Sequence, residues 1–188
     1  MSDIPIHRLS PNGAPRQGKV NLLVAGFSRQ SVVSLNEILQ AIETLPAFHL
    51  EKLNTIEYAP IWDVGDELEY YESRLSLAAS GRYVFEDKSI LMHKFINKKL
   101  FHRMLFHEVG HFVFYNVIGG DLKKEWVTRL YPEYPYITRY ASRNGSEDFA
   151  ECYASYVLEP GKLMHIIEKF SFMKHQVFMG FVPDASKL

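Results

Sequence analysis

The first sixty residues alternate between short apolar runs and polar breaks. Residues 19–27 form a short, mostly apolar run rich in branched side chains, which is typical of a buried strand. Apolar residues then recur at helical spacing up to Leu45, and Ser34 with Glu37 fits a capping box at the start of that stretch. Because Pro46 cannot continue a helix, the pattern predicts a strand followed by a helix that stops before this proline.

The middle of the chain favours strands. Residues 48–58 contain a second, more polar strand pattern, and the pattern of residues 63–77 is ambiguous but fits a loop followed by a short helix. Residues 82–86 and 89–93 are typical of two strands joined by a turn at residues 87–88.

From residue 97 onward the apolar spacing becomes helical. Residues 97–117 carry most of their large apolar side chains on roughly one face. Three shorter helices are predicted to follow, at residues 121–130, 146–158 and 161–175. Ser146 is the expected cap of the second, and Ile167 is expected to point inward from the third. This order predicts an α+β fold, in which a small mixed β-sheet from the N-terminal half packs on a mainly helical C-terminal half.

Length and targeting signals add expectations about organisation. The 188 residues suit one domain, and residues 1–18 are polar with three prolines, so we expect a flexible tail before a single domain over residues 19–188. No apolar run near the start resembles a secretory signal, so we expect a cytoplasmic protein, with export without a leader as the alternative. No stretch of 18 apolar residues occurs, so we expect no membrane partner.

Charge and composition narrow the function classes. The chain has 21 Lys and Arg against 22 Asp and Glu, and it has no basic stripe, so we expect no nucleic-acid partner. Cys152 is the only cysteine, which excludes a disulfide within the chain and a zinc site built from several cysteines. Aromatic residues make up 14% of the chain. They contribute much of the hydrophobic core, and any surplus can line a groove for an extended ligand.

One motif in the predicted helix over residues 97–117 carries chemistry. His107, Glu108 and His111 match H-E-x-x-H, and residues four apart project from the same helical face. Two imidazoles at this spacing can reach one zinc ion, and Glu108 can act as general base toward a water at the metal. The alternative is a core-packed helix with two partly exposed histidines.

A catalytic zinc needs a third protein ligand, and the helix predicted near residue 146 offers carboxylates. Glu147 and Glu151 lie four residues apart on one face, so one can bind the metal while the other hydrogen-bonds a ligand histidine. The residues alone leave the two roles open. Asp148 is expected to complement the helix dipole as part of an acidic first turn.

Peptide hydrolysis also needs a donor to the developing oxyanion, which a phenol can supply. The residues alone leave several candidates for this role: Tyr131, Tyr134, Tyr136 and Tyr140 in one loop, and the downstream His165 and His175.

The segment from Tyr140 to Tyr153 (YASRNGSEDFAECY) resembles the zinc-site segment of the anthrax lethal factor catalytic domain and of the Pro-Pro endopeptidases, a gluzincin-like group of metallopeptidases. In that family a tyrosine stands seven residues before the glutamate ligand, which opens an E-x-F-A-E helix. The resemblance covers about a third of the chain, from the predicted helix that carries His107 to the predicted helix that carries Glu151. It implies that zinc is bound by His107, His111 and Glu147, that Glu108 is the base, that Tyr140 stabilises the oxyanion and that Glu151 supports the ligands.

The sequence therefore predicts a zinc-dependent endopeptidase that hydrolyses a protein or peptide substrate. We expect that substrate to bind as an added β-strand along residues 81–93. A peptide deformylase is rejected, because its cysteine ligand precedes the H-E-x-x-H motif whereas Cys152 follows it. The alternative from another class is a zinc-binding protein-interaction module or an inactive metallopeptidase relative.

Overall fold

The structure of the chain, a computed structural model, describes residues 22–60, 81–132 and 135–188. The predicted tail over residues 1–18 and the ambiguous segment over residues 63–77 lie outside the described residues.

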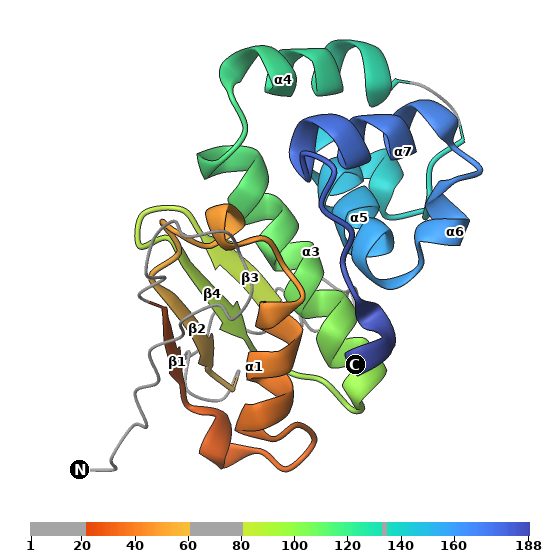
Figure 1. Cartoon of the computed structure of the whole chain (residues 1–188). Helices are drawn as coiled ribbons and strands as arrows, with labels where there is room; N and C mark the ends of the chain where they lie inside the picture. Colours follow the sequence, from red (N-terminus) through yellow and green to blue (C-terminus); the bar gives the residue numbers. More distant parts are fainter. Residues whose placement is uncertain (1–21, 61–80, 133–134) are drawn as a thin grey trace.

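The described strands form one mixed four-stranded sheet in the order β1-β2-β4-β3. Its strands are β1 (Leu23–Ala25), β2 (Thr55–Tyr58), β3 (Gly81–Val84) and β4 (Ser89–Met92). β1, β2 and β4 run parallel, whereas β3 pairs antiparallel with β4. Among the described residues, β1 and β3 are the two edge strands of the sheet. The sheet and the helices after it confirm the predicted α+β fold (Figure 1).

Local sequence explains where the strands begin and turn. The predicted hairpin is confirmed, and Lys88 takes a left-handed conformation, with φ of 50°, between its two strands. The predicted strand over residues 48–58 begins later than expected, because Ala47–His49 form a 3₁₀ turn directly after Pro46. Within β2, Ile56 and Tyr58 are buried, as the alternating pattern requires.

Helix α1 (Leu35–Glu43) is fixed at its start by the predicted capping box. The Ser34 hydroxyl accepts from the Glu37 backbone N–H at 3.3 Å, and the Glu37 carboxylate accepts from the Ser34 N–H at 2.7 Å. Ile38 and Ile42 of this helix are buried in the same hydrophobic core as the sheet.

The long helix α3 (Lys98–Asn116) is the centre of the molecule. The Asn97 side chain caps it by accepting from the Leu100 N–H at 2.8 Å. The helix packs against β3 and β4 on one side and against α5 on the other (Figure 1). Because both sides are covered, Leu105 and Val109 are fully buried.

The C-terminal half is helical, with more breaks than the sequence predicted. Its helices are α4 (Gly120–Glu125), α5 (Gly145–Leu158), α6 (Pro160–Leu163) and α7 (Ile167–Phe172). The Asn144 side chain, rather than that of Ser146, caps α5. The helix predicted over residues 161–175 is split into α6, α7 and a π-helical turn, Met173–Val177. Ile167 is consequently 76% exposed, so the inward position expected for it was wrong.

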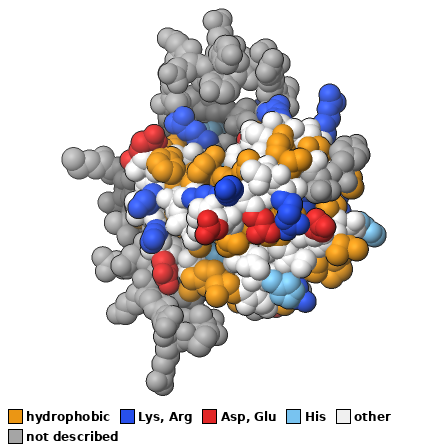
Figure 2. All heavy atoms as spheres, turned by 90° about the horizontal axis from the view of Figure 1, so that it is seen from above, with side chains coloured by type: hydrophobic (Ala, Val, Ile, Leu, Met, Phe, Trp, Pro, Cys, Tyr) orange, Lys and Arg blue, Asp and Glu red, His pale blue; other side chains and the backbone are white. Residues whose placement is uncertain are grey.

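The surface over α4 and α7 carries both charge signs. Seen from that side, acidic and basic side chains lie next to one another, with hydrophobic ones between them (Figure 2). On these elements, Arg129 forms ion pairs with Glu125 at 2.6 Å and with Glu168 at 3.3 Å. Among the described residues, no helix is both long and apolar enough to cross a membrane.

The burial of His49 allows a prediction of how the free energy of unfolding changes at acidic pH. Its ring nitrogens lie 2.8 Å from the Tyr153 hydroxyl and 2.9 Å from the Val177 carbonyl, and burial lowers the pKa of His49 from 6.5 to about 4. The fold thus favours the neutral ring, and this contribution is complete above the unfolded pKa and lost as the pH falls from about 6.5 to about 4.

We expect this titration to remove about 3 kcal/mol of unfolding free energy between pH 7 and pH 4. Urea unfolding of wild type and His49→Gln, whose amide does not titrate, measures it. The variant should be less stable at pH 7, and its deficit should shrink by that amount at pH 4. An unchanged deficit would contradict a neutral buried His49.

Candidate metal centre

The two histidines of the motif point from α3 toward α5. One turn separates His107 and His111, and their Nε2 atoms lie 3.1 Å apart. His107 is buried and His111 is partly buried. The buried Nδ1 of His111 has no hydrogen-bond partner in the part of the chain that the structure describes.

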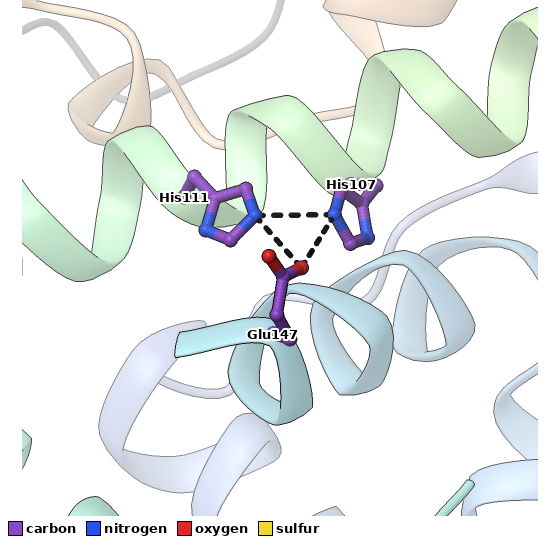
Figure 3. A group of neighbouring side chains, drawn as sticks. All are labelled: His107, His111 and Glu147. Atoms are coloured by element: carbon purple, nitrogen blue, oxygen red, sulfur yellow. Dashed lines mark hydrogen bonds and ion pairs between the residues drawn. The ribbon is translucent and has the colours of Figure 1, made fainter. Parts of the chain in front are cut away.

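Glu147, in the first turn of α5, completes a triangle with these histidines (Figure 3). Its Oε2 lies 3.2 Å from the Nε2 of His107 and 3.2 Å from the Nε2 of His111. Zinc binds such atoms at about 2.0–2.1 Å, so tetrahedral ligands stand about 3.3–3.4 Å apart. The three separations are close to this spacing, and the group could therefore hold a metal ion.

The charge around His107 is also suited to a cation. Its Nδ1 donates to the Glu151 Oε1 at 2.9 Å, so in the neutral ring the Nε2 lone pair faces the Glu147 carboxylate. Two lone pairs repel unless a proton or a metal lies between them. Burial alone lowers the pKa of His107, but hydrogen bonds to Glu147 and Glu151 outweigh it and raise the pKa to about 9.

Glu151 orients the His107 ring by binding its Nδ1, the ring nitrogen that is not part of the triangle. Its Oε2 accepts a hydrogen bond from the Arg103 guanidinium at 2.5 Å, and the carboxylate also accepts one from the Thr138 side chain. Burial opposes its ionisation, but the His107 hydrogen bond and Arg103 lower the pKa of Glu151 to about 2. Sequence reasoning missed Arg103, although it precedes His107 by four residues and therefore shares its helical face.

Glu108 lies on the side of α3 that faces the sheet. It is buried beside Gly81, where an added Cβ would stand 3.5 Å from the Glu108 Cγ, and it accepts a hydrogen bond from the Tyr83 backbone. Burial raises the pKa of Glu108, although both histidines of the motif oppose the shift. A carboxylate with a raised pKa is suited to accept a proton near neutral pH.

Tyr140 is the candidate oxyanion donor that lies beside this group. Its ring centroid is 5.8 Å from that of His107, and the Arg143 guanidinium carbon stands 4.3 Å from the Tyr140 centroid. Burial, and then the charge of Glu147, raise the pKa of Tyr140 to about 12, so its phenol keeps its proton at neutral pH.

The other candidates for that role have different surroundings. The Tyr131 hydroxyl donates to the Ser142 carbonyl at 3.1 Å, and the Tyr136 ring faces the Lys169 ammonium at 4.8 Å. His165 and His175 are exposed in the segment that follows α5, and Tyr134 lies outside the described residues.

Asp148 differs from its expected role. It lies in the acidic first turn of α5, but it is fully buried and pairs with the equally buried Lys169 at 2.9 Å. Burial raises the pKa of Asp148 to about 6, against the opposing effect of Lys169. This ion pair ties α7 to the turn of α5 that carries Glu147.

Gly110 sets the distance between the two helices of the site. A Cβ at this position would stand 2.8 Å from the Ala150 Cα and 3.1 Å from the Tyr153 Cβ. Gly110 precedes His111, and Ala150 lies between Glu147 and Glu151 along α5. The missing side chain therefore lets α3 and α5 approach closely where their ligand atoms meet.

Comparison with known proteins does not identify a function for this chain, so the functional assignment depends on its own residues. No protein-family model matches this chain, and a search of curated proteins finds no match.

The approach at Gly110 can be tested by adding one methyl group. Gly110→Ala should overpack the α3–α5 contact at a cost of about 1–3 kcal/mol, and alanine's better helix propensity recovers at most about 1 kcal/mol. We expect lower stability in urea and a lower metal content. Gly161→Ala is the control, because that glycine is also helical and has no atom within 4 Å of an added Cβ. Equal behaviour of the two variants would contradict the packing role of Gly110.

Proposed function

We propose that the protein is a zinc-dependent endopeptidase. The observation that supports this most is the triangle formed by the two histidine Nε2 atoms and the Glu147 Oε2, with the buried Glu108 carboxylate on the same helix. Two imidazoles and one carboxylate suit a catalytic zinc, which keeps a further position for water or substrate. The resemblance of residues 140–153 to the lethal factor and Pro-Pro endopeptidase segment agrees with this assignment.

Zinc at this site would polarise the scissile carbonyl and lower the pKa of bound water. His107, His111 and Glu147 would hold the ion, while Glu151 fixes the ring orientation of His107 through its Nδ1. Arg103 keeps Glu151 ionised and in place.

The chain's own groups handle the protons. The Glu108 carboxylate takes a proton from the attacking water and then delivers it to the nitrogen of the leaving amine. Its raised pKa makes the protonated form accessible during this cycle. The Tyr140 hydroxyl donates a hydrogen bond to the oxygen that becomes negative as the carbonyl is attacked.

Strand β3 is the element beside which we place the substrate. It is one of the two edge strands among the described residues, and it is the one whose Gly81 lies next to Glu108. An extended peptide that adds to this edge by backbone hydrogen bonds would bring a peptide bond beside the base. This mode suits a protein or peptide substrate.

The first prediction concerns the ligands. One zinc per chain is expected, and His107→Ala and His111→Ala should lose it, because two remaining ligands bind zinc poorly. Glu147→Ala should lose zinc as well, whereas Glu151→Ala should weaken affinity by about 10–100-fold. Metal analysis by mass spectrometry and competition with a chelator measure both effects. Stoichiometric zinc in either histidine variant, or the reverse order of the two glutamates, would contradict the assignment.

The second prediction separates binding from chemistry. Glu108→Gln preserves the shape of the side chain but removes the base, so it should keep zinc and lose nearly all peptide cleavage. A mixed-peptide digest with metal analysis of the same samples tests this. Zinc in wild type without any cleavage would favour a zinc-binding interaction module or an inactive relative.

The third prediction concerns the oxyanion. Tyr140→Phe removes one hydroxyl and little packing, so it should lower kcat by about 100- to 1,000-fold with KM little changed, because the interaction forms mainly in the transition state. Steady-state kinetics on any cleaved peptide measures it. An unchanged kcat would transfer this role to another donor.

A further inference from the structure

Three aromatic side chains stand together at one end of the site. They are Tyr83 in β3, Phe85 just after β3 and Tyr115 near the end of α3, and we call them the aromatic wall. The Tyr83 and Tyr115 rings are stacked at 6.3 Å, and the Phe85 ring meets the Tyr115 ring edge-on at 6.0 Å. Residues 81, 83 and 85 share one face of the extended chain, because side chains alternate along a strand.

Within the aromatic wall, Tyr83 is fixed by its neighbours, whereas the other two rings are exposed to solvent. The Asn116 amide donates to the Tyr83 hydroxyl at 2.6 Å, and Phe112 meets the Tyr83 ring at 5.7 Å. Phe85 is nevertheless 57% exposed and Tyr115 is 42% exposed. A cluster of exposed aromatic rings costs free energy in water, and such clusters commonly mark a binding surface.

The aromatic wall is continuous with the metal centre. The Tyr115 ring lies 6.5 Å from that of His111 and is nearly parallel to it, at 22°. At the other end of β3, Gly81 lies beside Glu108. A chain running along β3 would thus pass the base at one end and the aromatic wall, next to the ligand His111, at the other.

We infer that the aromatic wall binds a large apolar side chain of the substrate peptide, two to four residues on the N-terminal side of the cleaved bond. This inference rests on the proposed function. The chemical class follows from the three rings, none of which carries a charge. The side follows from strand direction: β3 runs from Gly81 toward Phe85, and a peptide paired antiparallel with it runs from the aromatic wall toward Glu108.

Cleavage of a randomised peptide library by the zinc-loaded full chain tests this. Sequencing the products should show large apolar residues enriched at one such position, by about tenfold or more, since burying one large apolar side chain has an effect of this size. Phe85→Ala and Tyr115→Ala should each reduce the enrichment while cleavage of peptides without an apolar residue there continues. Phe85→Ala is the more decisive variant, because Phe85 has no ring contact with a ligand histidine among the described residues.

Ile167→Ala is the matched control, because it removes an apolar side chain that is 76% exposed on α7. Its cleavage profile should equal that of wild type. A wild-type profile without apolar preference, a preference on the C-terminal side of the cleaved bond, or one that survives Phe85→Ala would overturn the inference while leaving the proposed function intact. No cleavage by zinc-loaded wild type would instead overturn the proposed function, and this inference with it.

Discussion

The close approach of α3 and α5 at Gly110 and Ala150 is the constraint on which the site depends. Two ligands come from one helix and one from the other, so the triangle exists only while their backbones remain close. An α-helix repeats its face about every four residues, and both helices use that repeat. On α3 it aligns Arg103, His107 and His111. On α5 it places Glu147 and Glu151 on the side that meets them.

The second constraint is electrostatic, because the packing around α3 and α5 buries several charged or ionisable groups. Each has a partner of opposite charge or a hydrogen-bond donor: Glu151 has Arg103, Asp148 has Lys169, and Glu108 has the Tyr83 backbone. Such pairs are costly to break, since removing one partner leaves the other buried and uncompensated. The triangle is the place where lone pairs converge, and a cation there would balance the Glu147 charge. The packing of the two helices and the proposed metal chemistry therefore depend on the same buried charges.

The sequence predicted the parts of the molecule that depend on local spacing. The H-E-x-x-H repeat, the capping box at Ser34 and the turn at residues 87–88 each involve residues within a few positions, and all three lie where expected. Features that depend on tertiary packing were missed or misplaced. Asp148 was assigned to the helix dipole because nothing local indicates that Lys169 will be buried against it. The aromatic wall joins β3 to the end of α3, about thirty residues apart, so no periodic pattern could indicate it.

The central claim is that one zinc ion binds between α3 and α5. Anomalous diffraction at the zinc absorption edge, from crystals of the full chain grown with zinc, tests it most directly. We expect one strong peak within bonding distance of the Nε2 atoms of His107 and His111 and of a Glu147 carboxylate oxygen, with Glu151 still hydrogen-bonded to the Nδ1 of His107. A zinc peak coordinated by other residues would contradict this claim. So would the absence of a peak between α3 and α5 in crystals where zinc fully occupies another site.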